Sequence, residues 1–200
     1  MIKNIVFDVG MVLVDFNWRK VMADVGCTPE ETETIAKVMV NGTLWNELDR
    51  GIMEEEDVIA QMMAQLPGLE EKAMAFWNNV DKTIVPFPYA ADWVKDLHDR
   101  GYHTYLLTNY PRSLYASTAE KFTFLPYVDD VLVSAREKLV KPDPAIYERL
   151  LEKFHLNASE TVFIDDRKVN IEGGEKVGIR GIVFTNYEEV KEKLDKILKE

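Results

Sequence analysis

The sequence predicts an α/β protein, a doubly wound parallel sheet into which a helical-bundle cap domain is inserted. Short apolar runs of strand type alternate with amphipathic helical patterns, which is typical of a parallel sheet covered by helices on both faces. Residues 17–83, by contrast, contain helical patterns only. One apolar run precedes that stretch and the others follow it, so the helices are expected to interrupt the sheet-forming part of the chain.

The first expected strand covers residues 5–7 and is followed at once by Asp8. The later strands come after the helical stretch, as apolar runs at residues 104–107, 131–133, 162–164 and 182–184. Apolar residues at helical spacing predict the helices that separate and follow these strands. The helices are expected at residues 89–100, 113–122, 144–154, 170–177 and 188–198.

The helical stretch has recognisable boundaries. Thr28 and Glu31 form a capping box, with Pro29 at the first helical position, and apolar residues recur at helical spacing as far as Val80. The chain then returns through residues 84–88, where two prolines predict a stiff hinge. The expected domains are a core of residues 1–16 and 84–200 and a cap of residues 17–83.

Composition excludes several classes of protein. Of the 200 residues 46% are hydrophobic, which argues against disorder. No apolar run approaches the length of a membrane span and no signal segment opens the chain, so we expect a cytoplasmic protein with no membrane partner. A formal net charge of -11 argues against nucleic acid as a partner. Cys27 is the single cysteine, so no internal disulfide forms, and oligomeric state is not readable from the sequence.

Polar residues follow three of the expected strands. Asp8 follows the first, Thr108 and Asn109 follow the second, and Asp165 and Asp166 follow the fourth. In open parallel sheets, ligands bind in the crevice beyond the carboxyl ends of the strands. We therefore expect these side chains to converge on one site.

The convergence predicts a chemistry. Grouped carboxylates repel one another unless a cation lies among them, and an all-oxygen ligand set without histidine suits Mg²⁺. Lys141, just before the helix expected at residues 144–154, adds an ammonium group at the same edge, and Asp143 is expected to cap that helix. A carboxylate, a hard cation, a lysine and a hydroxyl together suit phosphoryl transfer through an aspartyl-phosphate.

At these residues the sequence resembles the haloacid dehalogenase superfamily, specifically its magnesium-dependent phosphatases with a helical cap. The resemblance covers essentially the whole chain and implies a Rossmann-like core. It is carried by four motifs in the expected order, at residues 7–10, 107–109, 141–144 and 163–167.

The resemblance implies a role for each of these residues. Asp8 would be the nucleophile, Thr108 and Asn109 would hold the transferring phosphoryl group, and Lys141 would neutralise charge on both nucleophile and phosphate. The substrate is then a small phosphorylated metabolite.

The resemblance also implies the metal ligands. Mg²⁺ would bind one oxygen of Asp8, the backbone carbonyl of Gly10 and the carboxylate of Asp166. Asp165 would support the waters of the metal from outside the ligand set, and Asn170 would steady that loop.

Gly10 departs from the Asp-x-Asp pattern of most of these phosphatases, whose second aspartate protonates the leaving oxygen. General acid–base catalysis is typically worth about 10²–10⁴ in rate. The form Asp-x-Gly resembles a branch with bacterial glucose 1-phosphate phosphatases, whose leaving groups depart more easily. The rate is thus expected to depend steeply on the leaving group, unless Asp15 or a cap residue supplies the acid.

Other functions stay open at this level. A phosphomutase needs the acid and base that Gly10 lacks, a dehalogenase has no use for the metal indicated by Asp165 and Asp166, and a non-catalytic binder of a phosphorylated ligand gains nothing from Asp8. Substrate specificity is expected in a cap loop around residues 46–51 and, with less support, at Trp18 and Arg19.

Overall fold

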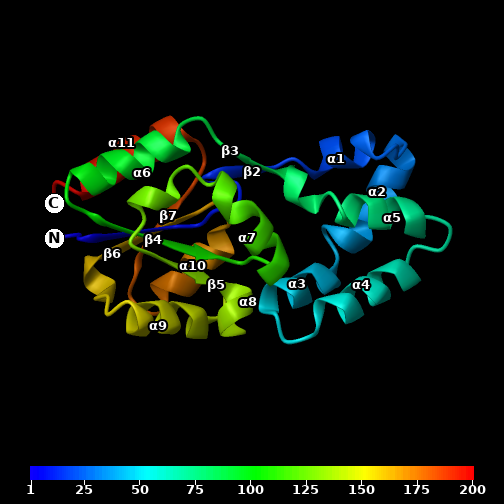
Figure 1. Cartoon of the computed structure of the whole chain (residues 1–200). Coiled ribbons are helices and arrows are strands. Elements are labelled where there is room, and N and C mark those ends of the chain that lie inside the picture. The colour runs from blue at the N-terminus through cyan, green and yellow to red at the C-terminus, as the bar shows by residue number, and fades with distance from the viewer.

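The computed structural model describes residues 1–200 and confirms the predicted fold class. Its centre is a five-stranded sheet of order β5-β4-β1-β6-β7, in which every neighbouring pair is parallel (Figure 1). The strands are β1 (Asn4–Phe7), β4 (His103–Thr108), β5 (Asp130–Val133), β6 (Thr161–Asp165) and β7 (Arg180–Val183). All five expected strands are present, and β1 lies at the centre of the sheet.

Helices cover both faces of this sheet, so its central strands are buried on both sides. Ile5 and Phe7 of β1 pack into one apolar cluster, whereas Val6 between them packs into a second cluster on the opposite face. The first face is covered by α6 (Ala90–Asp99), α7 (Arg112–Thr118) and α11 (Tyr187–Ile197). The second is covered by α9 (Pro144–Lys153) and α10 (Lys168–Glu175), and Asp143 caps α9 as predicted.

The helices between β2 and β3 form a group of their own beside the carboxyl edge of the sheet (Figure 1). We call residues 17–83 the helical insertion. Its helices are α1 (Trp18–Asp24), α2 (Pro29–Met39), α3 (Thr43–Arg50), α4 (Glu55–Ala64) and α5 (Glu70–Trp77), followed by the 3₁₀ turn η1 (Val80–Thr83). The predicted capping box at Thr28 is present at the start of α2. Buried residues of the insertion join the larger apolar cluster of the sheet, so the two groups share one core.

Two short strands were not expected from the sequence. β2 (Val14–Phe16) and β3 (Ile84–Pro86) pair antiparallel, with Phe16 opposite Ile84, and form a ribbon at the entry and exit of the insertion. The stretch expected to be only a hinge is therefore partly a strand. The expected loop at residues 46–51 is also wrong, because α3 runs through it to Arg50.

The remaining elements are short. They are α8 (Ser134–Glu137) after β5 and the 3₁₀ turns η2 (Ala119–Lys121), η3 (Leu125–Tyr127) and η4 (Ala158–Glu160). None of the helices combines the length and apolar character needed to cross a membrane.

Candidate active site

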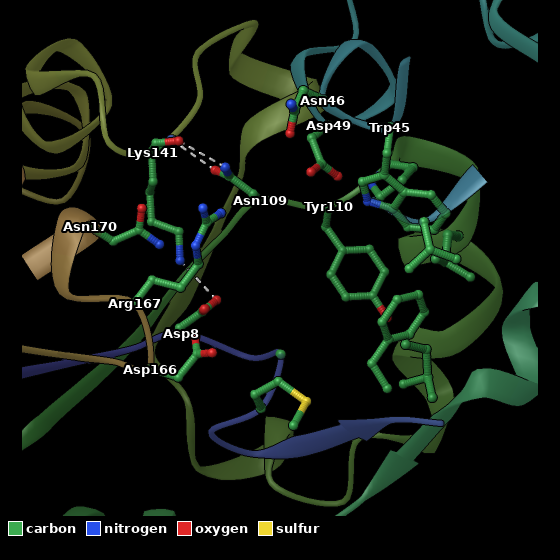
Figure 2. A pocket seen from close by; sticks show the side chains of 17 residues that line it. Asp8, Trp45, Asn46, Asp49, Asn109, Tyr110, Lys141, Asp166, Arg167 and Asn170 are labelled. Carbon is green, nitrogen blue, oxygen red and sulfur yellow. Dashed lines mark hydrogen bonds and ion pairs between the residues drawn. The ribbon is translucent and has the colours of Figure 1, made fainter. Parts of the chain in front are cut away.

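The carboxyl ends of β1 and β6 bring three carboxylates together. Asp8 follows β1, Asp165 ends β6 and Asp166 comes next, and one carboxylate oxygen from each lies within 4.8 Å of the others. Figure 2 shows Asp8 and Asp166 side by side at one wall of the pocket. The convergence expected from the strand ends is therefore present.

Lys141 lies buried among these carboxylates. Its Nζ is 2.9 Å from Oδ1 of Asp8 and 2.7 Å from Oδ2 of Asp165, and it donates a third hydrogen bond, of 3.0 Å, to the carbonyl of Leu107. Only 4% of the residue is exposed. Three acceptors for three ammonium protons fix the position of the charge beside Asp8.

Asp165 holds this lysine in place. The residue is 0% exposed, and besides Lys141 it accepts hydrogen bonds from Nδ2 of Asn170 and from the backbone N–H of Arg167. Its oxygens are thus used by the protein itself. Asn170 donates to both oxygens of Asp165, at 3.0 Å each.

Asn109 and Thr108 end β4 close to Lys141. The side-chain amide of Asn109 donates to the Lys141 carbonyl at 3.0 Å, and its Oδ1 accepts from the Lys141 N–H at 2.8 Å, so both amide groups clasp the lysine backbone. Asn109 lines the pocket, whereas Thr108 is buried at the strand end behind it. The structure therefore places Thr108 further from the open pocket than the sequence suggested.

Electrostatics at the site favour a cation. Burial raises the pKa of Asp8 to about 7, with Lys141 opposing the shift and the carboxylates of Asp165 and Asp166 adding to it. Burial, followed by the charge of Asp165, also raises the pKa of Asp166. Burial alone would lower the pKa of Lys141, but the charges of Asp8 and Asp165 outweigh it and the pKa is raised. The charges of Lys141 and, at Asp166, of Arg167 oppose the shifts of the two carboxyl groups without cancelling them.

The residues present fit a hard divalent cation. Asp8 binds Lys141 through Oδ1, and Asp166 is only half buried, so carboxylate oxygens remain for a metal. The hydrogen bonds of the turn after β1 run from Met11 to Val14 and from Val14 to Val9, which leaves the Gly10 carbonyl without a protein partner. Carboxylate and carbonyl oxygens are ligands that Mg²⁺ accepts.

The pocket beside these groups has a volume of about 260 Å³ and two unlike walls (Figure 2). We call one of them the sheet wall; it is polar and consists of Asp8, Asn109, Lys141, Asp166, Arg167 and Asn170. Figure 2 shows Trp45 and Tyr110 across the pocket from Asp8 and Lys141. The rest of the lining is largely apolar, with Met11, Phe16, Val40, Trp45, Ile84, Tyr110, Pro111 and Leu114. A phosphate bound at the sheet wall would place its organic group against this apolar part of the lining.

The helical insertion contributes Val40, Trp45, Asn46 and Asp49 to the lining of this pocket. We call these four residues the insertion wall. Asn46 and Asp49 belong to the segment that the sequence singled out for specificity. Asp49 is 6% exposed, and Figure 2 shows its carboxyl group pointing into the pocket from the side opposite Asp8.

Other expected specificity residues lie elsewhere. Arg19 pairs with Glu33 at 2.8 Å and stacks on Trp18, and neither Arg19 nor Trp18 lines the pocket. Asp15 lies in β2, also outside the pocket lining. Tyr110 and Phe16 also line the pocket, although the sequence analysis assigned them no role. The signal that could have identified them is their closeness in the chain to the motifs at residues 107–109 and 7–10.

Comparisons with known proteins agree with this architecture. The family model of haloacid dehalogenase-like hydrolases matches residues 2–178. A sesquiterpene phosphatase of Aspergillus oryzae is 28% identical, over 92% of this chain and 90% of its own. A D-ribitol-5-phosphate phosphatase of Bacteroides thetaiotaomicron is 29% identical over 99% of both chains.

Solved structures show the same fold. A haloacid dehalogenase family enzyme of Bacteroides thetaiotaomicron, in complex with magnesium and inorganic phosphate, superposes with a TM-score of 0.74 at 19% identity, over 95% of this chain and 99% of the other. An L-2-haloacid dehalogenase of Xanthobacter autotrophicus gives 0.71 at 18% identity, over 94% and 80%. Because the family model spans most of the chain and the strand-end motifs converge as that family requires, this protein belongs to the haloacid dehalogenase-like hydrolases.

Proposed function

We propose that the protein is a magnesium-dependent phosphatase that hydrolyses a small phosphomonoester through an aspartyl-phosphate on Asp8. The observation that carries the proposal is the ion pair of 2.9 Å between Asp8 and the buried Lys141, at the polar end of a pocket large enough for a small metabolite. Relatives at 28% and 29% identity that are named as phosphatases support it.

Asp8 is the nucleophile in this proposal. Lys141 binds Oδ1 of Asp8. The other carboxylate oxygen is therefore free to contact phosphorus or the metal. Lys141 also neutralises charge on the incoming phosphate, and the phosphoryl group binds at the end of β4 beside Asn109, with the buried Thr108 at the strand end. Because the Asn109 side chain clasps Lys141, its contribution to binding is made mainly through the lysine it orients.

Mg²⁺ is held by Asp8, Asp166 and the Gly10 carbonyl in this proposal. The ion supplies positive charge that stabilises the phosphoryl oxygens. Asp165 and Asn170 stay outside the ligand set and fix the lysine and the loop after β6. The raised pKa values of Asp8 and Asp166 support a cation here, because a nearby positive charge returns both carboxyl groups to their ionised forms.

A sugar phosphate is the first candidate substrate, supported by the relative named for ribitol 5-phosphate. The narrower likeness to glucose 1-phosphate phosphatases stays a prediction from the Asp-x-Gly motif. A second candidate is a phosphate ester with an apolar organic group. Phe16, Trp45 and Leu114 line the side of the pocket that such a group would contact, and the relative named for sesquiterpenes agrees with it.

Phosphate release from a panel of both substrate classes tests the proposal. Turnover should require Mg²⁺, and Ca²⁺ should inhibit because it takes more ligands at longer distances. Asp8→Asn should lower turnover at least about 10³-fold, because the amide keeps the shape and cannot attack phosphorus. Asp15→Asn is the matched control, a nearby carboxylate outside the pocket. Full turnover in excess chelator, or by Asp8→Asn, would reject the proposal.

A further inference from the structure

Gly10 leaves the sheet wall without an acid for the leaving group. A Cβ built on Gly10 would meet no atom within 4 Å, so the space where a second aspartate would reach is open. The other carboxyl groups of this wall already have roles in the proposed function, Asp8 as the nucleophile and Asp166 as a metal ligand. An acid for the reaction must therefore come from another part of the pocket.

Asp49 is the remaining carboxyl group that lines the pocket. The residue is only 6% exposed, and its Oδ1 has no hydrogen-bond partner in the protein. A buried carboxyl oxygen without a partner destabilises the folded protein, so folding alone does not account for this aspartate. Its side chain points across the pocket toward the side that holds Asp8 (Figure 2).

The backbone of Asp49 is fixed relative to the sheet. The Ser134 hydroxyl, at the start of α8, donates to the Asp49 carbonyl at 2.6 Å. Gly51 ends α3 with a φ of 64°, and a Cβ at that glycine would lie 2.5 Å from the carbonyl oxygen of Ala135. Only glycine allows both this conformation and so close an approach. The end of α3 is thereby docked on α8, and the carboxyl group of Asp49 is held at the pocket.

The geometry points to Asp49 as the general acid that protonates the leaving oxygen, in place of the aspartate missing at Gly10. The inference rests on the proposed phosphatase function. As an Asp8 oxygen bonds to phosphorus and the bond from phosphorus to the leaving oxygen breaks, the Asp49 proton passes to that oxygen and a neutral alcohol departs. Asp49 then takes a proton from the water that attacks phosphorus, which restores the Asp8 carboxylate and releases inorganic phosphate.

The surroundings of Asp49 keep it protonated near neutral pH. Burial raises its pKa to about 7; the Asp8 charge adds to the shift, and the charges of Lys141 and Arg167 oppose it. The hydrogen bond from α8, donated by the uncharged Ser134 hydroxyl, goes to the backbone carbonyl of Asp49 and not to its carboxyl group. Tyr110 is the other acid nearby, but burial raises its pKa and its hydroxyl pairs with Thr118 at 3.1 Å. An acid with a pKa near the working pH is the most effective.

The test is a leaving-group series at fixed Mg²⁺, from alkyl phosphates to aryl phosphates of falling leaving-group pKa. The ratio kcat/KM is measured because it reports the steps up to departure of the leaving group. Wild type should depend weakly on leaving-group pKa. Asp49→Asn should lose about 10²–10³-fold with alkyl phosphates, much less with the most activated aryl phosphate, and the fall in rate above neutral pH should disappear.

A second variant supplies the rescue. Gly10 does not have a positive φ and its side-chain space is open, so Gly10→Asp fits without strain. Combined with Asp49→Asn, it should restore at least about a tenth of the alkyl phosphate rate. Glu47→Gln, on the same helix and paired at 3.9 Å with Arg50, is the matched control.

Each outcome decides the inference. An equal loss with every leaving group, or a change in KM alone, would make Asp49 a binding residue and overturn it. A steep leaving-group dependence in wild type would overturn it without any variant, even if Asp49→Asn failed to fold. A wild type that releases no phosphate from any ester would instead reject the proposed function itself.

Discussion

The two walls of the pocket are built in opposite ways. On the sheet wall, Lys141 has three acceptors, and the Asn109 side chain is engaged at both ends. On the insertion wall, Trp45 and Val40 are apolar, and the one buried carboxyl group has an oxygen with no partner. The sheet wall is rigid because its polar groups are hydrogen-bonded to one another. The insertion wall instead presents apolar side chains and an unpartnered carboxyl oxygen to the pocket.

This contrast separates two requirements of the reaction. Attack on phosphorus needs a charge arrangement that is set before substrate arrives, and a saturated hydrogen-bond network provides it. Recognition of the organic group needs a surface whose shape matches that group, and the side chains of the inserted helices contribute to such a surface. The walls therefore predict different responses to mutation, with the largest expected on the sheet wall.

Lys141→Met should have the largest effect on stability. Removing the ammonium group leaves Asp8 and Asp165 buried without a counter-charge, which costs about 3–5 kcal/mol of the free energy of unfolding. Turnover should be lost as well. Urea denaturation measures the first effect, and Lys168→Met, at an exposed pair of 3.4 Å with Glu172, should cost less than about 0.5 kcal/mol. Equal losses of stability in the two variants would mean that the buried ion pairs of Lys141 matter no more than the exposed pair of Lys168.

Asp49→Asn should change the pH dependence of stability. In the folded protein the pKa of Asp49 is about 7, above the value of about 3.9 in an unfolded chain, so ionisation costs the folded state more as the pH rises from about 4 to about 7. Above that window the cost is constant. Relative to wild type, the variant should therefore gain roughly 2–4 kcal/mol between pH 4.5 and pH 8. Denaturation of wild type and variant in the presence of a chelator, at both pH values, measures this difference in the free energy of unfolding. An equal gain by Asp15→Asn would contradict the assignment of the pH dependence to Asp49.

Trp45→Ala should alter substrate preference more than catalysis. Trp45 lines the pocket, with its ring 5.6 Å from that of Phe16, so its loss removes contact with an apolar organic group. We expect kcat/KM to fall about 10-fold or more for terpenoid phosphates and less for sugar phosphates. Trp77→Ala is the control, because Trp77 packs on Trp45 from outside the pocket. A uniform loss across substrates would mean that the insertion wall also shapes the catalytic groups.

Thr28→Ala should have the smallest effect. It removes the capping box of α2, which is remote from the pocket, and costs about 1 kcal/mol of stability. Thermal unfolding should register the loss while kcat and KM stay within about twofold. A larger change in kcat would show that catalysis is sensitive to the stability of the inserted helices as a whole.

The same contrast explains what the sequence could predict. Asp8, Asn109 and Asp165 are recognisable because each lies at the end of a strand or directly after it, and parallel strands bring their carboxyl ends to one edge whatever the details of packing. Asp49 carries no such signal. Its orientation depends on how α3 rotates and docks on α8, which the apolar spacing of α3 leaves open. The sequence therefore identified a segment that lines the pocket, but as a loop for substrate specificity rather than a helix, and it did not distinguish Asp49 from its neighbours.

The ribbon was missed for a related reason. β2 and β3 have three residues each, too few for an alternating pattern to be distinguished from a loop, and the prolines near β3 favoured a hinge. Trp18 and Arg19 lie close to the pocket residue Phe16 in the sequence, but they stack on each other outside the pocket lining.

The ribbon has a further consequence for how such proteins diversify. Because β2 and β3 lie side by side, the chain leaves and re-enters the sheet-forming part at one place, where segments of very different length can be exchanged without shifting the register of the sheet. Phe16 and Ile84 of the ribbon line the pocket, so any new segment grafted there enters next to the reaction centre. A single recombination event at this point can thus replace the substrate surface and the proton donor together.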